Sequence, residues 1–129
     1  MRALVRTVDG VYEVDLEDEV VLGPSGAHVE LPTLELSLPR VVAAAKSGAT
    51  VIAVVDTRPP LVISGDAGVT WREAGGGLPA GRSVAIADDN PDVVVYAARN
   101  RLYLSKDGGR FWRSLAPELP EIEAVAVLW

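Results

Sequence analysis

The stretch Ser64-Gly65-Asp66-Ala67-Gly68-Val69-Thr70-Trp71 returns 41 residues later as Ser105-Lys106-Asp107-Gly108-Gly109-Arg110-Phe111-Trp112. Both copies follow the pattern Ser-x-Asp-x-Gly-x-Thr-Trp, with Phe111 in the place of the threonine in the second. In such a pattern the aspartate accepts backbone N–H groups across a tight turn, and the glycine adopts a positive φ that other residues resist. The tryptophan supplies a large ring that can be buried. The sequence therefore predicts two equivalent turns in a repeated structural unit.

The repeat extends beyond these two turns. A fixed period of about 40 residues with strand-forming content is typical of β-propeller blades. Leu-Pro pairs at 38–39, 78–79 and 119–120 keep the same period, and each precedes an apolar run of small residues. These runs are predicted to be the innermost strands, at 41–45, 83–87 and 122–127. Second strands are expected at 50–55 and 93–98, third strands at 60–64 and 101–105, and fourth strands from 70 and 111. Segments 40–79 and 80–120 are thus predicted to be two four-stranded antiparallel blades.

The two ends of the chain carry the parts of a third blade. Segments 2–7 and 10–14 match second and third strands, whereas 122–129 matches an inner strand with no second strand after it. Joining 1–39 with 121–129 makes a third blade, either within one chain or with a partner, and satisfies strand edges that would otherwise be free. The segment after Val14 lacks the repeated turn and is predicted to form an extended loop or a longer hairpin. We expect one all-β domain, 1–129, with three blades.

Three blades are too few for a closed propeller, which has 4–8 blades. A homodimer would provide six blades in a ring with two-fold symmetry. Trp129 is then placed to cover an open blade edge in the partner.

The two turns resemble the Asp-box (bacterial neuraminidase repeat) of sialidase-like, sortilin-like and photosystem II assembly-factor-like propellers, and segment 84–98 resembles the stretch that precedes such boxes. The resemblance covers about residues 40–129. It implies a propeller fold and a structural role for the boxes, away from any active face. The matching box residues are Ser64, Asp66, Gly68, Thr70, Trp71, Ser105, Asp107, Gly109 and Trp112.

No catalytic residues are expected. A sialidase-like site needs three arginines, a tyrosine nucleophile paired with a glutamate, and an acid/base aspartate. The three tyrosines, Tyr12, Tyr96 and Tyr103, all lie in strand-like runs and are predicted to be packing residues.

Composition excludes several classes of site. The chain has 129 residues, a net charge of −6 and no cysteine, so disulfides and thiolate ligands are impossible and general nucleic-acid binding is disfavoured. We expect no cofactor and no metal. His28 is the only histidine and reads as a surface-loop residue, and the turn at 88–92 needs no ion although Ca²⁺ favours such oxygen clusters. Without a signal peptide or a membrane-spanning run, a cytoplasmic location is expected.

Five arginines are predicted to gather at one end of the blades. The loops before the first strand and between the second and third strands share one end, opposite the boxes. They contain Arg40, Arg58, Arg82, Arg99 and Arg101. Guanidinium groups pair well with carboxylates and phosphates, so this end predicts an anionic ligand or an acidic partner. The alternative is solvated arginines, or ion pairs with Asp9, Asp56 and Glu121.

The sequence therefore favours a non-catalytic scaffold or binding module whose partner is a protein, an anionic small molecule or a glycan. A lectin-like module is the first alternative, although aromatic residues make up only 5% of the chain. A sialidase-like glycosidase site assembled across an oligomer is the second alternative.

Overall fold

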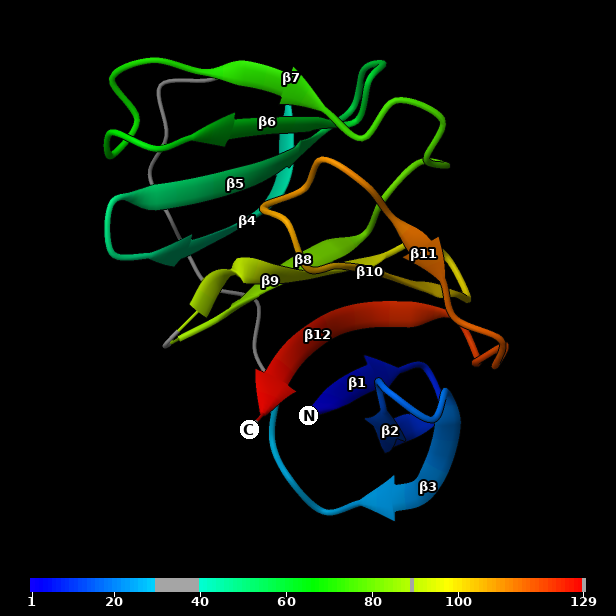
Figure 1. Cartoon of the computed structure of the whole chain (residues 1–129). Helices are drawn as coiled ribbons and strands as arrows, with labels where there is room; N and C mark the ends of the chain where they lie inside the picture. The colour runs from blue at the N-terminus through cyan, green and yellow to red at the C-terminus, as the bar shows by residue number, and fades with distance from the viewer. Residues whose placement is uncertain (30–39, 89, 129) are drawn as a thin grey trace.

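The computed structural model describes residues 1–29, 40–88 and 90–128, so Leu38, Pro39, Asp89 and Trp129, and with them part of the predicted first unit, lie outside the described residues. The described residues form twelve strands (Figure 1). Nowhere in these ranges is there a helix of the length and apolarity needed to cross a membrane. The strands are β1 (Arg2–Thr7), β2 (Gly10–Asp15), β3 (Val20–Ser25), β4 (Val41–Ser47), β5 (Thr50–Val55), β6 (Leu61–Ser64), β7 (Arg72–Ala74), β8 (Ser83–Ala87), β9 (Asn90–Ala97), β10 (Leu102–Ser105), β11 (Arg113–Ser114) and β12 (Ile122–Leu128).

These strands form three four-stranded antiparallel sheets, which confirms the all-β prediction. The first sheet has the order β12-β1-β2-β3, the second runs from β4 to β7, and the third from β8 to β11. In the first sheet, β12 pairs with β1 from Arg2↔Leu128 to Thr7↔Ile122. The C-terminal strand thus completes the first sheet within its own chain, which is one of the two predicted arrangements.

The strand bounds differ from the sequence prediction at β9 and around the boxes. β9 begins at Asn90, three residues before the predicted start and inside the predicted turn at 88–92, because its ladder with β8 extends to the pair Ala87↔Asn90. β7 and β11 begin at Arg72 and Arg113, two residues later than the predicted starts. The delay arises because Thr70 and Phe111 still belong to the box turns, where their backbone N–H groups bind the box aspartates. In the first unit, the predicted longer hairpin is formed by β2 and β3.

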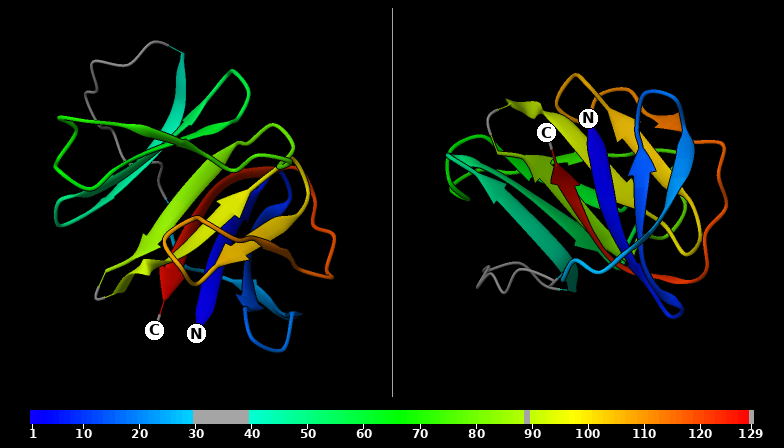
Figure 2. Two further views of the ribbon diagram at one scale, coloured as in Figure 1. Left: turned by 45° about the horizontal axis from the view of Figure 1, so that its top comes forward. Right: turned by 90° about the horizontal axis from the view of Figure 1, so that it is seen from below.

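The third sheet lies between the other two (Figure 1), and the two turned views keep this order (Figure 2). One core cluster joins the first and third sheets, and a second joins the third and second sheets. The inner strands β4, β8 and β12 therefore follow one another in space as β4, β8, β12.

Because the units repeat, each sheet has a front face and a back face that correspond to those of the other two sheets. We define the front face as the one that carries Tyr12, Val62 or Tyr103, and the back face as the one that carries Val11, Leu61 or Leu102, at matching positions of the third strands. The front of the third sheet packs on the back of the second, and the front of the first packs on the back of the third. The sheets are thus stacked head to tail.

Candidate functional site

The five predicted arginines lie at one end of the sheets, which we call the arginine end. The pairs Val41↔Val55 and Ser83↔Ala97 bring the starts of the inner strands beside the ends of the second strands. Arg40 and Arg82 precede those inner strands, and the loops at 56–60 and 98–101 follow those second strands. They carry Arg58, Arg99 and Arg101.

Three of the five arginines are held by glutamates. Glu121 lies 3.3 Å from Arg99 Nε and 3.7 Å from Arg82 Nη1. Arg101 donates from Nη2 to Glu118 Oε1 at 2.9 Å, and from Nη1 to the Leu115 carbonyl at 3.3 Å. The Glu121 pairs match the ion-pair alternative from the sequence, whereas Glu118 was missed. Glu118 could have been predicted from its position, because it lies in the connection from a fourth strand to an inner strand and that connection leads to the arginine end.

Arg40 and Arg58 differ from the other three. Among the described side chains, no carboxylate lies within ion-pair distance of either guanidinium, although Asp56 and Asp9 are at the same end. Both side chains are exposed. Of the predicted site, these two cations are therefore the ones available to an external anion.

Arg58 lies between two adjoining cavities. One, of about 240 Å³, is lined by Val55, Asp56, Thr57, Arg58, Pro60, Leu78 and Ala80. The other, of about 340 Å³, is lined by Arg58, Pro59, Pro60, Gly76, Gly77 and Leu78. Both are built from the loop between β5 and β6 and the connection from β7 to β8. The sequence placed Arg58 correctly beside a shared end of the sheet but did not reveal the apolar walls, which come from two loops about twenty residues apart.

Tyr96 supports this region from the third sheet. It is fully buried, and its hydroxyl donates to the Pro79 carbonyl at 2.5 Å. Tyr103 and Trp112 meet its ring edge to face at centroid distances of 6.2 and 5.9 Å. Burial raises the pKa of Tyr96 to about 12, Tyr103 adds to the rise, and Arg58 opposes it. Tyr96 is thus a neutral packing residue, as predicted, and its pKa is shifted away from that of an ionised nucleophile.

The first box forms at the opposite end of the second sheet. Asp66 Oδ1 accepts from the Thr70 backbone N–H at 2.9 Å and Oδ2 accepts from the Thr70 hydroxyl at 2.6 Å. Ser64, itself buried, donates to Oδ1 and accepts from the Gly68 N–H. The hydrogen bonds from Thr70, and then the one from Ser64, lower the pKa of Asp66 to about 2. Both oxygens of this carboxylate therefore accept hydrogen bonds that stabilise the turn.

The second box has the same framework without the threonine hydroxyl. Asp107 Oδ1 accepts from the Phe111 N–H at 3.0 Å and from the Ser105 hydroxyl at 2.8 Å. These bonds lower the pKa of Asp107. Phe111 cannot donate to Oδ2, and its ring is 79% exposed.

The two box tryptophans are less buried than predicted. Each ring N–H donates to a box carbonyl, Trp71 to Gly68 at 3.1 Å and Trp112 to Gly109 at 3.0 Å. Trp112 packs against the cluster between the third and second sheets. Trp71 is half-buried and belongs to none of the core clusters, because no described sheet packs against the front of the second sheet.

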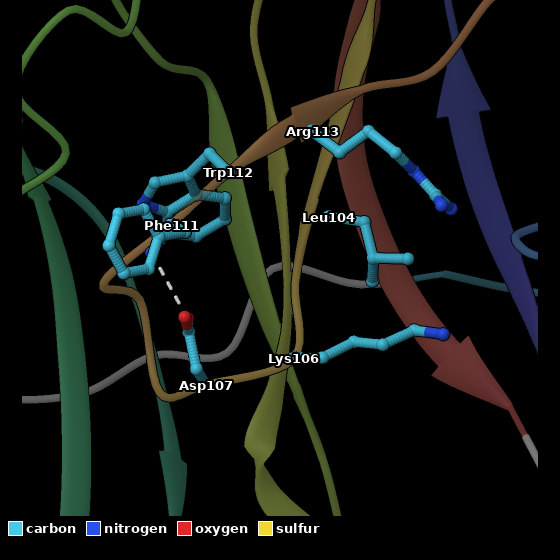
Figure 3. Close-up of a pocket in the computed structure, with 6 residues that line it drawn as sticks. All are labelled: Leu104, Lys106, Asp107, Phe111, Trp112 and Arg113. Carbon is cyan, nitrogen blue, oxygen red and sulfur yellow. Dashed lines mark hydrogen bonds between the residues drawn. The ribbon is translucent and has the colours of Figure 1, made fainter.

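A cavity of about 300 Å³ adjoins the second box (Figure 3). Lys106 and Arg113 extend in the same direction on either side of Leu104, while Phe111 and Trp112 lie on the other side of the strand. Arg113 is occupied by the first sheet, since it donates to the Leu16 carbonyl at 3.2 Å and lies 3.8 Å from Glu19. Lys106 is the cation of this cavity that no described carboxylate holds.

Within the described ranges, no group of three or more histidine, aspartate or glutamate side chains is arranged to hold a metal ion. His28 is exposed. At the 88–92 turn, Asn90 Oδ1 accepts from the Asp92 N–H, and the Asp92 carbonyl accepts from Gly108. One hydrogen bond therefore ties Asp92 to the second box.

The chain matches no family model, and no curated protein is significantly similar to it.

Proposed function

We propose that this protein is a non-catalytic binding module of the Asp-box propeller type, and that its arginine end takes a small anion with an apolar body, such as an aryl carboxylate or phosphate. The observation that carries the proposal is the position of Arg58. It is a cation with no described carboxylate partner, set between two cavities. One is walled mainly by prolines and Leu78, and the other adds Val55 and the polar residues Asp56 and Thr57.

The chemistry of this position favours such a ligand. A guanidinium offers two parallel N–H donors to a carboxylate or phosphate, and the apolar walls favour burial of a hydrophobic body. Asp56 at the rim of one cavity disfavours a second negative charge there. The ligand therefore carries its charge at one end.

The role is binding without catalysis because the groups a glycosidase would use are engaged elsewhere. The two box carboxylates are tied into turns, Tyr96 is buried, and Arg82, Arg99 and Arg101 pair with glutamates. A scaffold role for an acidic protein partner would use the same two available arginines, Arg40 and Arg58.

We further propose that the three sheets are propeller blades and that the protein works as a homodimer with six blades. Three sheets stacked head to tail leave two unlike faces at the ends, and a second copy presents the matching pair. The dimer would carry two copies of the arginine end.

The binding proposal is tested with naphthoate as the probe and uncharged naphthylmethanol as its neutral match, by calorimetric titration. The expected result is that naphthoate binds more tightly than naphthylmethanol and that Arg58→Gln weakens it by about tenfold or more, the range of a charge-assisted hydrogen bond. Arg99→Gln is the matched control, because Arg99 is an exposed arginine at the same end that Glu121 already holds. Equal affinity for the two probes, or equal effects of the two substitutions, would overturn the proposal.

A second candidate is supported by Phe111. Its ring is 79% exposed beside a cavity with Lys106, and exposed rings are what saccharide binding uses for stacking. Binding to a glycan array that is lost in Phe111→Ala and kept in Arg58→Gln would favour this lectin-like function instead.

A further inference from the structure

We infer that the front face of the second sheet docks on the back face of the first sheet of a second copy, so that two identical head-to-tail junctions close the dimer. This inference rests on the homodimer part of the proposed function and adds the surfaces that form it.

The two junctions inside the chain are built alike. From the second sheet, Arg72 Nη2 donates to the Gly108 carbonyl in the box of the third sheet at 3.1 Å. From the third sheet, Arg113 Nη2 donates to the Leu16 carbonyl in the turn between β2 and β3 of the first sheet at 3.2 Å. In each case the arginine lies in a fourth strand and binds the turn between the third and fourth strands of the next sheet. One junction is therefore used twice.

The faces left at the ends are the same pair that forms this junction. The front of the second sheet carries Val51, Ala53 and Val62, none of which belongs to a core cluster. The back of the first sheet carries Leu4, Val11, Ala124 and Ala126, together with the charged residues Arg2, Arg6 and Glu13. A head-to-tail junction repeats until it closes into a ring or grows into a fibre, and two copies give six sheets, within the range of closed propellers.

The two boxes differ in whether a neighbouring sheet packs against them. A Cβ on Gly109 would lie 2.7 Å from Ile63 Cδ1 of the second sheet, and Gly109 is buried. At the matching Gly68, among the described residues, a Cβ would approach its own box tryptophan, Trp71, at 3.5 Å and no residue of another sheet. The first box thus has the same fold as the second box, but among the described residues no neighbouring sheet packs against it.

The end faces are only partly exposed in the single chain. Val62 and Trp71 are half-buried, whereas Ala44, Val51, Ala53 and Val55 are buried. On the first sheet, Val29 covers Leu4 and Ala124, and Arg6 Nη1 donates to the Val29 carbonyl at 2.8 Å. Arg6 Nε is buried and lies 3.3 Å from Glu123 Oε1 as an ion pair, without hydrogen-bond geometry. In the dimer the partner's second sheet replaces Val29 over this face.

Complementary variants test the junction by sedimentation. Val62→Arg alters the front of the second sheet and Val11→Glu alters the back of the first, and both residues are only partly buried. Each variant alone breaks both junctions of its own dimer, so we expect its dimer dissociation constant to rise about tenfold or more. An equimolar mixture has one junction with wild-type faces and one with opposite charges, so dimers should return. Val8→Arg, a substitution at a 57% exposed residue of the arginine end, should leave dimerisation unchanged.

The outcomes separate the inference from the proposed function. Dimers that survive both substitutions, or a mixture that stays monomeric while circular dichroism shows both variants folded, would overturn the junction. Wild-type protein that is monomeric at every concentration would overturn the dimer as well. The naphthoate titration reports the binding function separately, because Arg58 is on neither face.

Discussion

At the scale of single residues, the box carboxylates act as structural anions. On one oxygen, Asp66 accepts from a serine hydroxyl and one backbone N–H, and Asp107 accepts from a serine hydroxyl and two backbone N–H groups. Only Asp66 also accepts from a threonine hydroxyl on the other oxygen. Hydrogen bonds to the charged form favour ionisation. Acid should therefore weaken the first box most.

This difference predicts an acid-labile contribution to stability. The folded pKa of Asp66 lies at about 2, below its usual 3.8, so the stabilisation is complete above about pH 4 and is lost as the pH falls toward 2. Asp66→Ala should be less stable than wild type at pH 7 and should lose less of its free energy of unfolding between pH 4 and 2. Urea unfolding across this range measures both.

Asp107→Ala is the matched comparison for the acid experiment, since its carboxylate lacks the threonine bond. We expect a smaller loss of acid dependence for this variant. If wild type and Asp66→Ala lost stability in parallel with acid, the box hydrogen bonds would not account for the lowered pKa.

At the scale of elements, the inner strands are held to one another by side chains. β12 forms its ladder with β1, so its other edge needs a partner. Ser83 at the start of β8 provides one, because its fully buried Oγ accepts from the Val125 N–H at 3.2 Å. This hydrogen bond joins the first and third sheets at their inner strands.

Ser83→Ala should cost about 1–3 kcal/mol in the free energy of unfolding, because it leaves the buried Val125 N–H without an acceptor. Ser47→Ala is the control, since Ser47 is an exposed-site donor to the Asp88 carbonyl at 3.2 Å and its loss should cost less than about 0.5 kcal/mol. Chemical denaturation of both variants measures the difference. Equal stabilities would show that the Val125 N–H finds another partner.

The elements also show what the sequence could and could not predict. The repeated box predicted the strands of the second and third sheets, and the unpaired segments at the two ends predicted that the C-terminal strand completes the first sheet. The late starts of β7 and β11 could not be predicted, since they depend on how far the aspartate hydrogen bonds reach along the turn. The cavities at Arg58 were also missed, because their walls join Pro59 and Leu78 from loops with no shared pattern.

Glu118 illustrates the same limit at the candidate site. The sequence predicted five arginines at one end from topology alone. Among the described side chains, three of these arginines pair with glutamates and two do not. The pairing of side chains that are far apart in the sequence depends on the loop conformations, so the pattern of strands could not supply it.

At the scale of the whole molecule, one type of junction orders the three sheets. Because each front face packs on the next back face, the three sheets form a stack with unlike outer faces, and the five arginines lie along one side of this stack, at the arginine end of the sheets. In the proposed dimer, two such stacks related by a two-fold axis would place both arginine ends on the same side of the ring.

The most direct test of this account is the mass of the native protein at low micromolar concentration, measured by native mass spectrometry. We expect a dimer of about 27 kDa, twice the 13.6 kDa of one chain. A monomer at every concentration, or an open ladder of higher oligomers in place of a closed pair, would contradict it.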